Sequence, residues 1–149
     1  MTGTKQVAHA VAVTSASAPQ WHVELRAGAH HLVADEPAAN GGGDAGPSPF
    51  GLLLSGPAAC TPITLRMYAE RKAWTVAAIE VDVRYHLADD GQAAIVRTIT
   101  VPTELPVDQL DRVADIAERT PVTLAVDAGT PITTTVRTND DRTTPRPGF

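Results

Sequence analysis

The residue best suited to covalent chemistry is Cys60, the only cysteine among 149 residues. The thiolate is the reactive form, so such a cysteine needs a cation or free amide dipoles nearby. Cys60 lies about ten residues into a predicted helix over 50–72, beyond the first turn where the helix dipole acts. A break at Pro57 would restart the helix just before Cys60 and leave free amides around the sulfur. The alternative is that Cys60 simply fills space in the core as a small hydrophobic residue.

Arginine side chains are the cations that could stabilise a thiolate. Three of them fall on predicted strands or helices, where a solvated face is the ordinary interpretation: Arg26, Arg66 and Arg84. Arg97 differs, because it stands between Ile95 and Ile99 on an otherwise apolar strand face. A cation there needs a reason, such as an anionic partner or a thiolate.

Metal and phosphate chemistry have little support in the sequence. Of the five histidines, His30 and His31 are adjacent, and side chains of adjacent strand residues point to opposite faces. No histidine has a helical partner at the spacing that metalloproteases use. The glycines at 41–43 lack the Gly-Lys-Ser/Thr ending of a phosphate-binding loop. We therefore expect no metal site and no cofactor.

Composition limits the function classes further. The net charge is −5 with a pI near 5.4, which argues against nucleic acid or an anionic membrane as the main partner. No apolar run approaches the ~18 residues of a membrane span, and the N-terminus lacks the pattern of a secretory signal. A single cysteine rules out an intrachain disulfide framework. We expect one cytoplasmic domain over 1–149, with a core at about 5–138 and a mobile tail at 139–149.

Hydrophobic periodicity predicts the elements that position these side chains. Alternation predicts strands over 7–13, 20–26 and 30–34, a hairpin of 76–86 with 94–101, and a last strand over 132–138. The helix over 50–72 is expected to kink or break near Pro57, and an amphipathic helix over 107–119 is interrupted or bent by Pro121. The long loop over 35–49 suggests a functional or flexible segment. This order predicts an α+β fold, and the very apolar central helix is a candidate for burial in a dimer.

The stretch from Asp35 to Trp74 resembles one known family. It contains Gly-Pro-Ser-Pro-Phe at 46–50, three leucines, Ala-Ala-Cys-Thr at 58–61 and Leu-Arg-Met-Tyr-Ala-Glu-Arg-Lys at 65–72. This pattern is similar to the OsmC/Ohr family, and most similar to its OsmC-like branch. The hairpin and the second helix, which ends in Thr120-Pro-Val, agree with it. The resemblance covers about residues 5–140 and implies antiparallel sheets around a long central cysteine-bearing helix in an intertwined homodimer.

The resemblance also implies a thiol peroxidase that reduces organic hydroperoxides at the subunit interface. In the family, the first cysteine attacks the peroxide and becomes a sulfenic acid, and a second cysteine before Pro-Val resolves it as a disulfide. An arginine supports the thiolate, and a carboxylate near the start of the cysteine helix holds that arginine.

This sequence departs from the family pattern at two functional positions. Thr120 stands where the family has the resolving cysteine, and Gly51 stands where many members have the carboxylate. Cys60 carries over, whereas the supporting arginine has no matching motif, and Arg26 and Arg97 are candidates from their pattern alone. Without a second thiol, a sulfenic acid at Cys60 would need an external thiol reductant or would over-oxidise.

These observations predict a one-cysteine peroxidase of oxidative stress defence, with Cys60 as nucleophile and Arg26 or Arg97 as thiolate stabiliser. The apolar pocket wall is predicted to contain Pro49, Phe50, Leu53, Leu54 and Met67, which suits a bulky organic hydroperoxide or another apolar small molecule. Two alternatives remain open. The fold could have lost peroxidase chemistry and bind small molecules, or Cys60 could serve other nucleophilic chemistry, such as addition to electrophiles.

Overall fold

The computed structural model describes residues 3–101 and 104–138 and has an α+β fold with antiparallel sheets. Strands β1 (Ala10–Val13), β2 (Val23–Ala27) and β3 (His30–Ala34) form one sheet in the order β1-β2-β3. A short 3-10 helix, η1 (Ala38–Asn40), follows, and then the long helix α1 (Pro49–Arg71). The second half contains the hairpin β4 (Glu80–Leu87) and β5 (Ala93–Thr100), then α2 (Val107–Ala117) and α3 (Pro121–Asp127). The predicted α+β class and the two antiparallel sheets are confirmed.

Helix α1 starts where its sequence provides a cap. The Ser48 hydroxyl accepts a hydrogen bond from the Gly51 amide at 3.1 Å, and Pro49 occupies the first turn, where a missing N–H costs nothing. The predicted break near Pro57 is wrong, because the helix runs unbroken through both Pro57 and Pro62. An interior proline costs about 3 kcal/mol in an isolated helix. Here α1 packs against β4, α2 and α3, and that packing outweighs the penalty.

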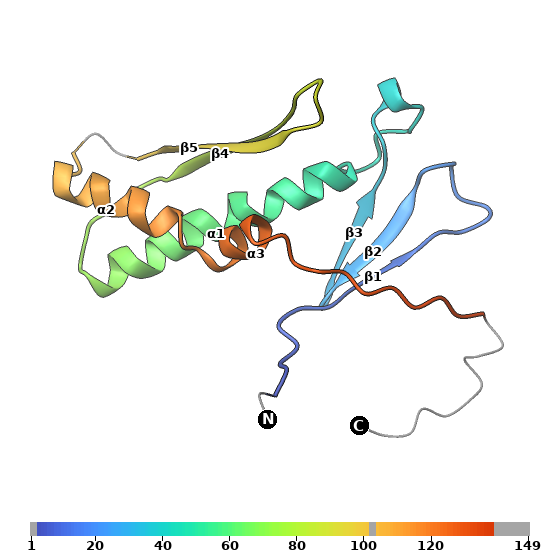
Figure 1. Ribbon diagram of the computed structural model, residues 1–149, viewed down its shortest axis with the longest axis horizontal. Helices are drawn as coiled ribbons and strands as arrows, with labels where there is room; N and C mark the ends of the chain where they lie inside the picture. Colours follow the sequence, from blue (N-terminus) through green and yellow to red (C-terminus); the bar gives the residue numbers. More distant parts are fainter. Residues whose placement is uncertain (1–2, 102–103, 139–149) are drawn as a thin grey trace.

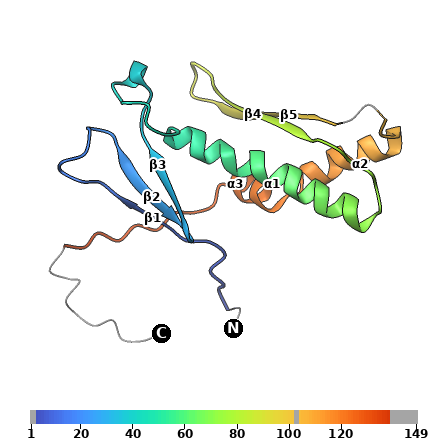
Figure 2. The same ribbon diagram turned by 180° about the vertical axis from the view of Figure 1, so that it is seen from behind.

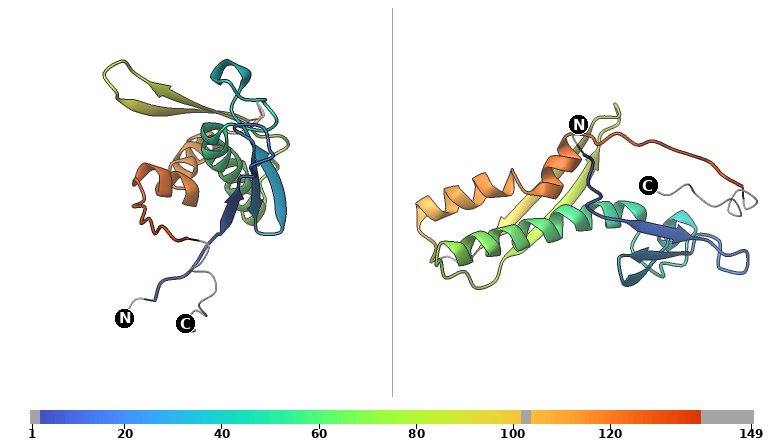
Figure 3. Two further views of the ribbon diagram at one scale, coloured as in Figure 1. Left: turned by 90° about the vertical axis from the view of Figure 1, so that its right-hand side faces the viewer. Right: turned by 90° about the horizontal axis from the view of Figure 1, so that it is seen from below.

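The core lies where the C-terminal half of α1 meets α2 and the hairpin. Leu65, Val113 and Ile116 are buried together, and partly buried side chains surround them: Tyr68, Ile79, Ile99 and Val101. In Figure 1 the hairpin runs along α1, and Figure 3 shows α2 and α3 beside α1 beneath it. Strand β4 alternates as predicted, with Val81, Val83 and Tyr85 half-buried and the intervening residues exposed.

The three-stranded sheet stands to one side of this core. Its substantial contacts within the described residues are those between its own strands, and Figure 2 shows it beside the N-terminal end of α1. The loop after β3 folds back closely on the sheet. A Cβ atom at Gly42 would lie 1.8 Å from the Glu36 carbonyl oxygen, and one at Gly46 would lie 2.1 Å from that of Val33. Only glycine fits at these two positions, because the backbone segments approach so closely.

Two further elements differ from the prediction, and one predicted segment is not tested. Helix α3 was not predicted as a separate element: Pro121 ends the preceding segment and begins a new helix at its first position. The predicted strand over 132–138 does not form, because no strand among the described residues lies beside this segment, and Ile132 and Val136 are about nine-tenths exposed. The predicted mobile tail over 139–149 lies outside the described residues.

Candidate functional site

Cys60 lies on α1, is half-buried, and carries a free thiol. Its sulfur is 3.9 Å from the Thr64 hydroxyl, one helical turn further on. Because α1 continues through Pro57, the amides around Cys60 belong to the helix and do not form a new N-terminus. The hypothesis that a helix restart activates the sulfur is therefore wrong.

The next residue, Thr61, is fully buried and begins a polar network. Its hydroxyl donates to the Pro57 carbonyl at 2.8 Å and accepts a hydrogen bond from the Arg97 Nη1 group at 3.1 Å. Arg97 reaches it from β5 and also donates from Nη1 to the Thr123 hydroxyl at 2.8 Å. The Thr123 hydroxyl in turn lies 2.7 Å from the hydroxyl of buried Thr120. The network joins β5, α1 and the start of α3.

Arg97 has the anionic partner that its apolar position called for. Its Nη2 lies 3.3 Å from Oε1 of Glu118, the residue just after α2. The Arg97 side chain is 12% exposed and that of Glu118 is 78% exposed, so the pair joins a nearly buried cation to a solvated carboxylate. None of the hydrogen bonds found among the described residues joins Arg97 to Cys60, and its role as thiolate stabiliser stays a prediction.

Arg26, the other candidate arginine, lies on β2 of the separate sheet. It is exposed and stands opposite Val11 on β1 and His31 on β3. Within one chain, β2, which carries Arg26, therefore lies in a separate sheet at the side of the helix that carries Cys60 (Figure 2).

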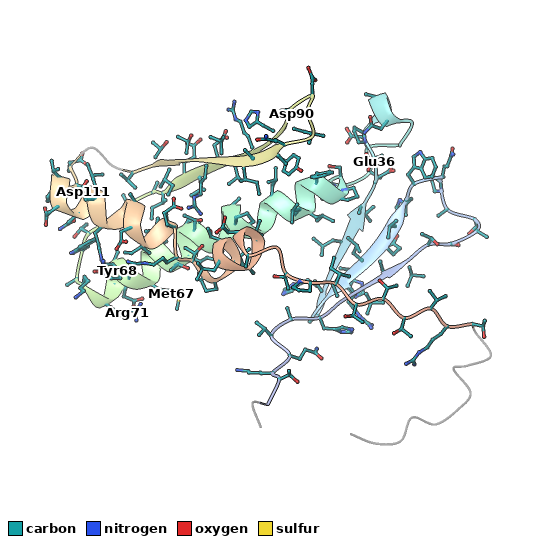
Figure 4. All side chains as sticks on the ribbon, in the orientation of Figure 1. Glu36, Met67, Tyr68, Arg71, Asp90 and Asp111 are labelled. Atoms are coloured by element: carbon teal, nitrogen blue, oxygen red, sulfur yellow. The ribbon has the colours of Figure 1, made fainter. Side chains whose placement is uncertain are left out.

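The predicted pocket residues are distributed over α1. Leu53 lines a cavity of about 520 Å³ between α1, the hairpin and α3, and Arg97 lines the same cavity. Leu54 lines a shallower groove of about 400 Å³ beside β4. The Phe50 ring packs on Tyr85 with 4.8 Å between ring centroids, next to Pro49 at the helix start. Met67 lies towards the opposite end of α1, near Tyr68 and Arg71 (Figure 4), and lines neither space.

The loop over 35–47 is held by one carboxylate. Buried Asp35 accepts hydrogen bonds from the amides of Glu36, Gly43 and Ala45 at 2.8, 3.1 and 3.2 Å. Burial by itself would raise the pKa of Asp35, but these bonds outweigh it and hold the pKa below its usual 3.8. The sequence suggested that this loop is either functional or flexible. A loop held by three hydrogen bonds to one buried carboxylate does not fit a flexible segment.

Sequence reasoning missed the partners of Arg97. It identified the cation but neither Thr61, Thr123 nor Glu118, because each comes from a different element. The pairing of Thr120 with Pro121, typical of a helix start, was the one available signal for α3. No group of metal-ligating side chains gathers within residues 3–101 and 104–138, and no helix there is long and apolar enough to cross a membrane.

The sequence model of the OsmC-like protein family matches residues 41–135, which include Cys60, Arg97 and Thr120. The chain belongs to the OsmC-like protein family. No curated protein sequence matches this OsmC-like protein, but solved structures share its fold.

Three such structures illustrate the likeness. An OsmC-like protein from Mycoplasma pneumoniae is 19% identical, with 83% of this chain and 89% of that chain covered and a TM-score of 0.64. The organic hydroperoxide resistance protein OsmC from Legionella pneumophila is 17% identical, with coverage of 83% and 91% and a TM-score of 0.60. The organic hydroperoxide resistance protein OhrB of Bacillus subtilis is 22% identical, with coverage of 81% and 90% and a TM-score of 0.55. Identities this low establish the fold alone.

The structure shows what surrounds Gly51 and Thr120, the two positions that differ from the family pattern. Gly51, where the resemblance implies a carboxylate, lines the groove beside β4 in this OsmC-like protein. The carboxylate that pairs with Arg97 is that of Glu118, two residues before Thr120. Glu118 and, through Thr123, Thr120 thus both connect to Arg97 at the α2–α3 junction.

Proposed function

We propose that this OsmC-like protein is a thiol-dependent peroxidase that reduces organic hydroperoxides through Cys60 in a one-cysteine mechanism. The observation that carries the proposal is the free, half-buried thiol of Cys60 on the helix that the family match covers. Relatives of the same fold are named for organic hydroperoxide resistance, which agrees with this chemistry.

The proposed reaction has two stages. The Cys60 sulfur attacks the terminal peroxide oxygen, the O–O bond breaks, an S–O bond forms, and the thiol proton ends on the departing alcohol. Since Thr120 cannot resolve the sulfenic acid, an external thiol attacks the oxidised sulfur and releases water. A second external thiol then breaks this mixed disulfide, regenerates Cys60 and leaves as an external disulfide.

We further propose that the active form is a homodimer with its site at the subunit interface. Within one chain neither candidate arginine bonds to Cys60, and Arg26 is exposed on the separate sheet. A second copy could supply the cation that the thiolate requires. Replacing Arg26 and Arg97 one at a time by glutamine should identify it, since the stabilising arginine is the one whose loss slows Cys60 oxidation.

Intact-mass measurement tests the chemistry directly. The purified protein receives one equivalent of an organic hydroperoxide in the presence of a sulfenic-acid trap, with Cys60→Ala as the control. We expect Cys60 to be trapped far faster than a free thiol at the same pH, and the variant to stay unmodified. A wild-type thiol that stays unmodified over the same time would rule out the peroxidase.

A binding function is the second candidate, and the 520 Å³ cavity favours it because Cys60 does not line this space. In that case the fold retains a small-molecule site and Cys60 is dispensable. An apolar ligand that binds equally well to wild type and to Cys60→Ser would support this function. Cysteine addition to electrophiles stays the third possibility, marked by rapid alkylation of Cys60 without peroxide reactivity.

A further inference from the structure

The cavity beside Arg97 has the size and walls of a ligand site. Its volume of about 520 Å³ falls within the ~300–1,000 Å³ typical of small-molecule pockets. Most of the lining residues are apolar or aromatic, although polar atoms form about half of the exposed wall; the apolar ones come from α1, the hairpin and α3 and include Leu53, Val83, Tyr85, Ile95 and Val126. An aliphatic chain that leaves water to contact these apolar residues would therefore gain free energy.

One nearly buried charge faces this apolar space. The Arg97 side chain is 12% exposed and lines the cavity. Its partners are two neutral hydroxyls and the solvated carboxylate of Glu118 at 3.3 Å. These bonds use three of the five N–H groups of a guanidinium, so two have no partner among the described residues. A buried cation is unfavourable unless an anion and hydrogen bonds satisfy it, and this one is incompletely satisfied.

The acidic residues at the same cavity restrict the charge of its ligand. Glu118 and Asp127 also contribute to the lining, so a ligand with several negative charges would be repelled. A single carboxylate can replace the weakly held Glu118 carboxylate on Arg97, with better geometry because guanidinium and carboxylate pair through two parallel hydrogen bonds.

We infer that this cavity binds an aliphatic monocarboxylate, with its carboxylate on Arg97 and its chain along the apolar wall. The inference deepens the binding function proposed above by naming its ligand class. It does not depend on peroxidase chemistry, because Cys60 is absent from the lining.

Calorimetric titration of the full-length protein with three probes of equal chain length tests the ligand class. Octanoate should bind with saturation, while octan-1-ol and octylamine should bind at least about tenfold more weakly. If octan-1-ol binds as well as octanoate, the arginine contributes nothing and the inference fails. Tighter binding of octylamine would also overturn it, since Glu118 and Asp127 would then set the specificity.

Two variants test the anchor. Arg97→Gln should weaken octanoate binding by about tenfold or more, whereas the matched control Arg84→Gln, on the exposed face of the same hairpin, should leave it unchanged. Since Arg97 also holds Thr61 and Thr123, its loss could unfold the protein, and Glu118→Gln provides an independent test. Removing this competing carboxylate should tighten octanoate binding, and an unchanged or weaker affinity in Glu118→Gln would contradict the assignment.

The variant Cys60→Ser separates this inference from the peroxidase proposal. Octanoate should bind to it as to the wild type. Loss of binding in Cys60→Ser would mean that the ligand occupies the cysteine site instead, which would overturn the inference. Failure of the sulfenic-acid test would leave octanoate binding intact, so the two proposals fail independently.

Discussion

Asp35 is a single side chain that orders a whole loop. Its carboxylate accepts three backbone hydrogen bonds that fix the return of the chain from β3 towards α1. A carboxylate whose pKa is lowered in the folded protein stabilises that state while ionised. This contribution is present above the unfolded pKa and is lost as the pH falls through the lower folded pKa, below the usual 3.8.

We therefore expect Asp35→Asn to lower the melting temperature at neutral pH, because a neutral amide accepts these amide hydrogen bonds less strongly. The gap between variant and wild type should narrow as the pH falls below about 4, where the wild-type carboxylate becomes protonated. Thermal unfolding followed by circular dichroism across this range measures both effects. Exposed Asp44 in the same loop supplies the control, since Asp44→Asn should change little. A gap that widens towards acid would contradict this role for Asp35.

Arg97 shows how a conflict within the sequence can mark a site. A cation between two isoleucines predicted an unusual environment, and the structure provides one made of Thr61, Thr123 and Glu118. The pattern could identify the arginine but not its partners, because these lie 21 or more positions away along the chain. The glutamine variants of Arg26 and Arg97 identify which of the two stabilises the Cys60 thiolate, because loss of that arginine should slow Cys60 oxidation.

At the scale of the element, α1 depends on both a local cap and tertiary packing. Pro57 and Pro62 each remove an interior hydrogen bond, yet α1 remains continuous. The buried Thr61 hydroxyl adds a bond to the Pro57 carbonyl inside the same stretch. A helix weakened internally in this way should be sensitive to loss of its terminal cap.

Removing the cap in Ser48→Ala should reduce the free energy of unfolding by about 1 kcal/mol, since the Gly51 amide loses its acceptor. Chemical denaturation measures this change. The control is Ser55→Ala, because the Ser55 hydroxyl also bonds to Gly51, but to its carbonyl from within the helix. We expect the Ser55 change to be much smaller. If both substitutions lowered the free energy of unfolding equally, the Ser48 cap would not stabilise α1 more than an interior serine does.

At the scale of the molecule, one chain leaves much apolar surface uncovered. Six hydrophobic side chains are buried among the described residues, whereas Ile63 and Met67 on α1 are each 58% exposed. The three-stranded sheet contacts little beyond itself, and the segment after α3 runs extended away from the helices (Figure 1). Exposed apolar surface of this kind is typical of an interface between copies. It supports the proposed homodimer.

The alternating segment over 132–138 allows a test of that dimer. Replacing both Ile132 and Val136 by aspartate places charges on one face of the segment and should shift the protein from dimer to monomer in light scattering. The matched control replaces Thr133 and Thr135, on the opposite face, by aspartate and should leave the dimer intact. A wild-type protein that is already monomeric would contradict the proposed assembly, as would a dimer insensitive to the first pair.

Local patterns in the sequence were sufficient for most of the elements and for the family. Alternation located β2 to β5, a helical run over 50–72 located α1, and the motifs around Cys60 indicated the family that the match over 41–135 establishes. These features depend on neighbours a few residues apart, so they can be read along the chain.

Tertiary structure decided what depends on distant residues. Packing against β4, α2 and α3 kept α1 continuous through prolines that alone would break it. No strand lies beside 132–138 within residues 3–101 and 104–138, so this segment forms no strand despite an alternating pattern similar to that of β4. The partners of Arg97 were likewise fixed only when β5, α1 and α3 came together, because hydrogen bonds and strand pairing need a partner that periodicity does not specify.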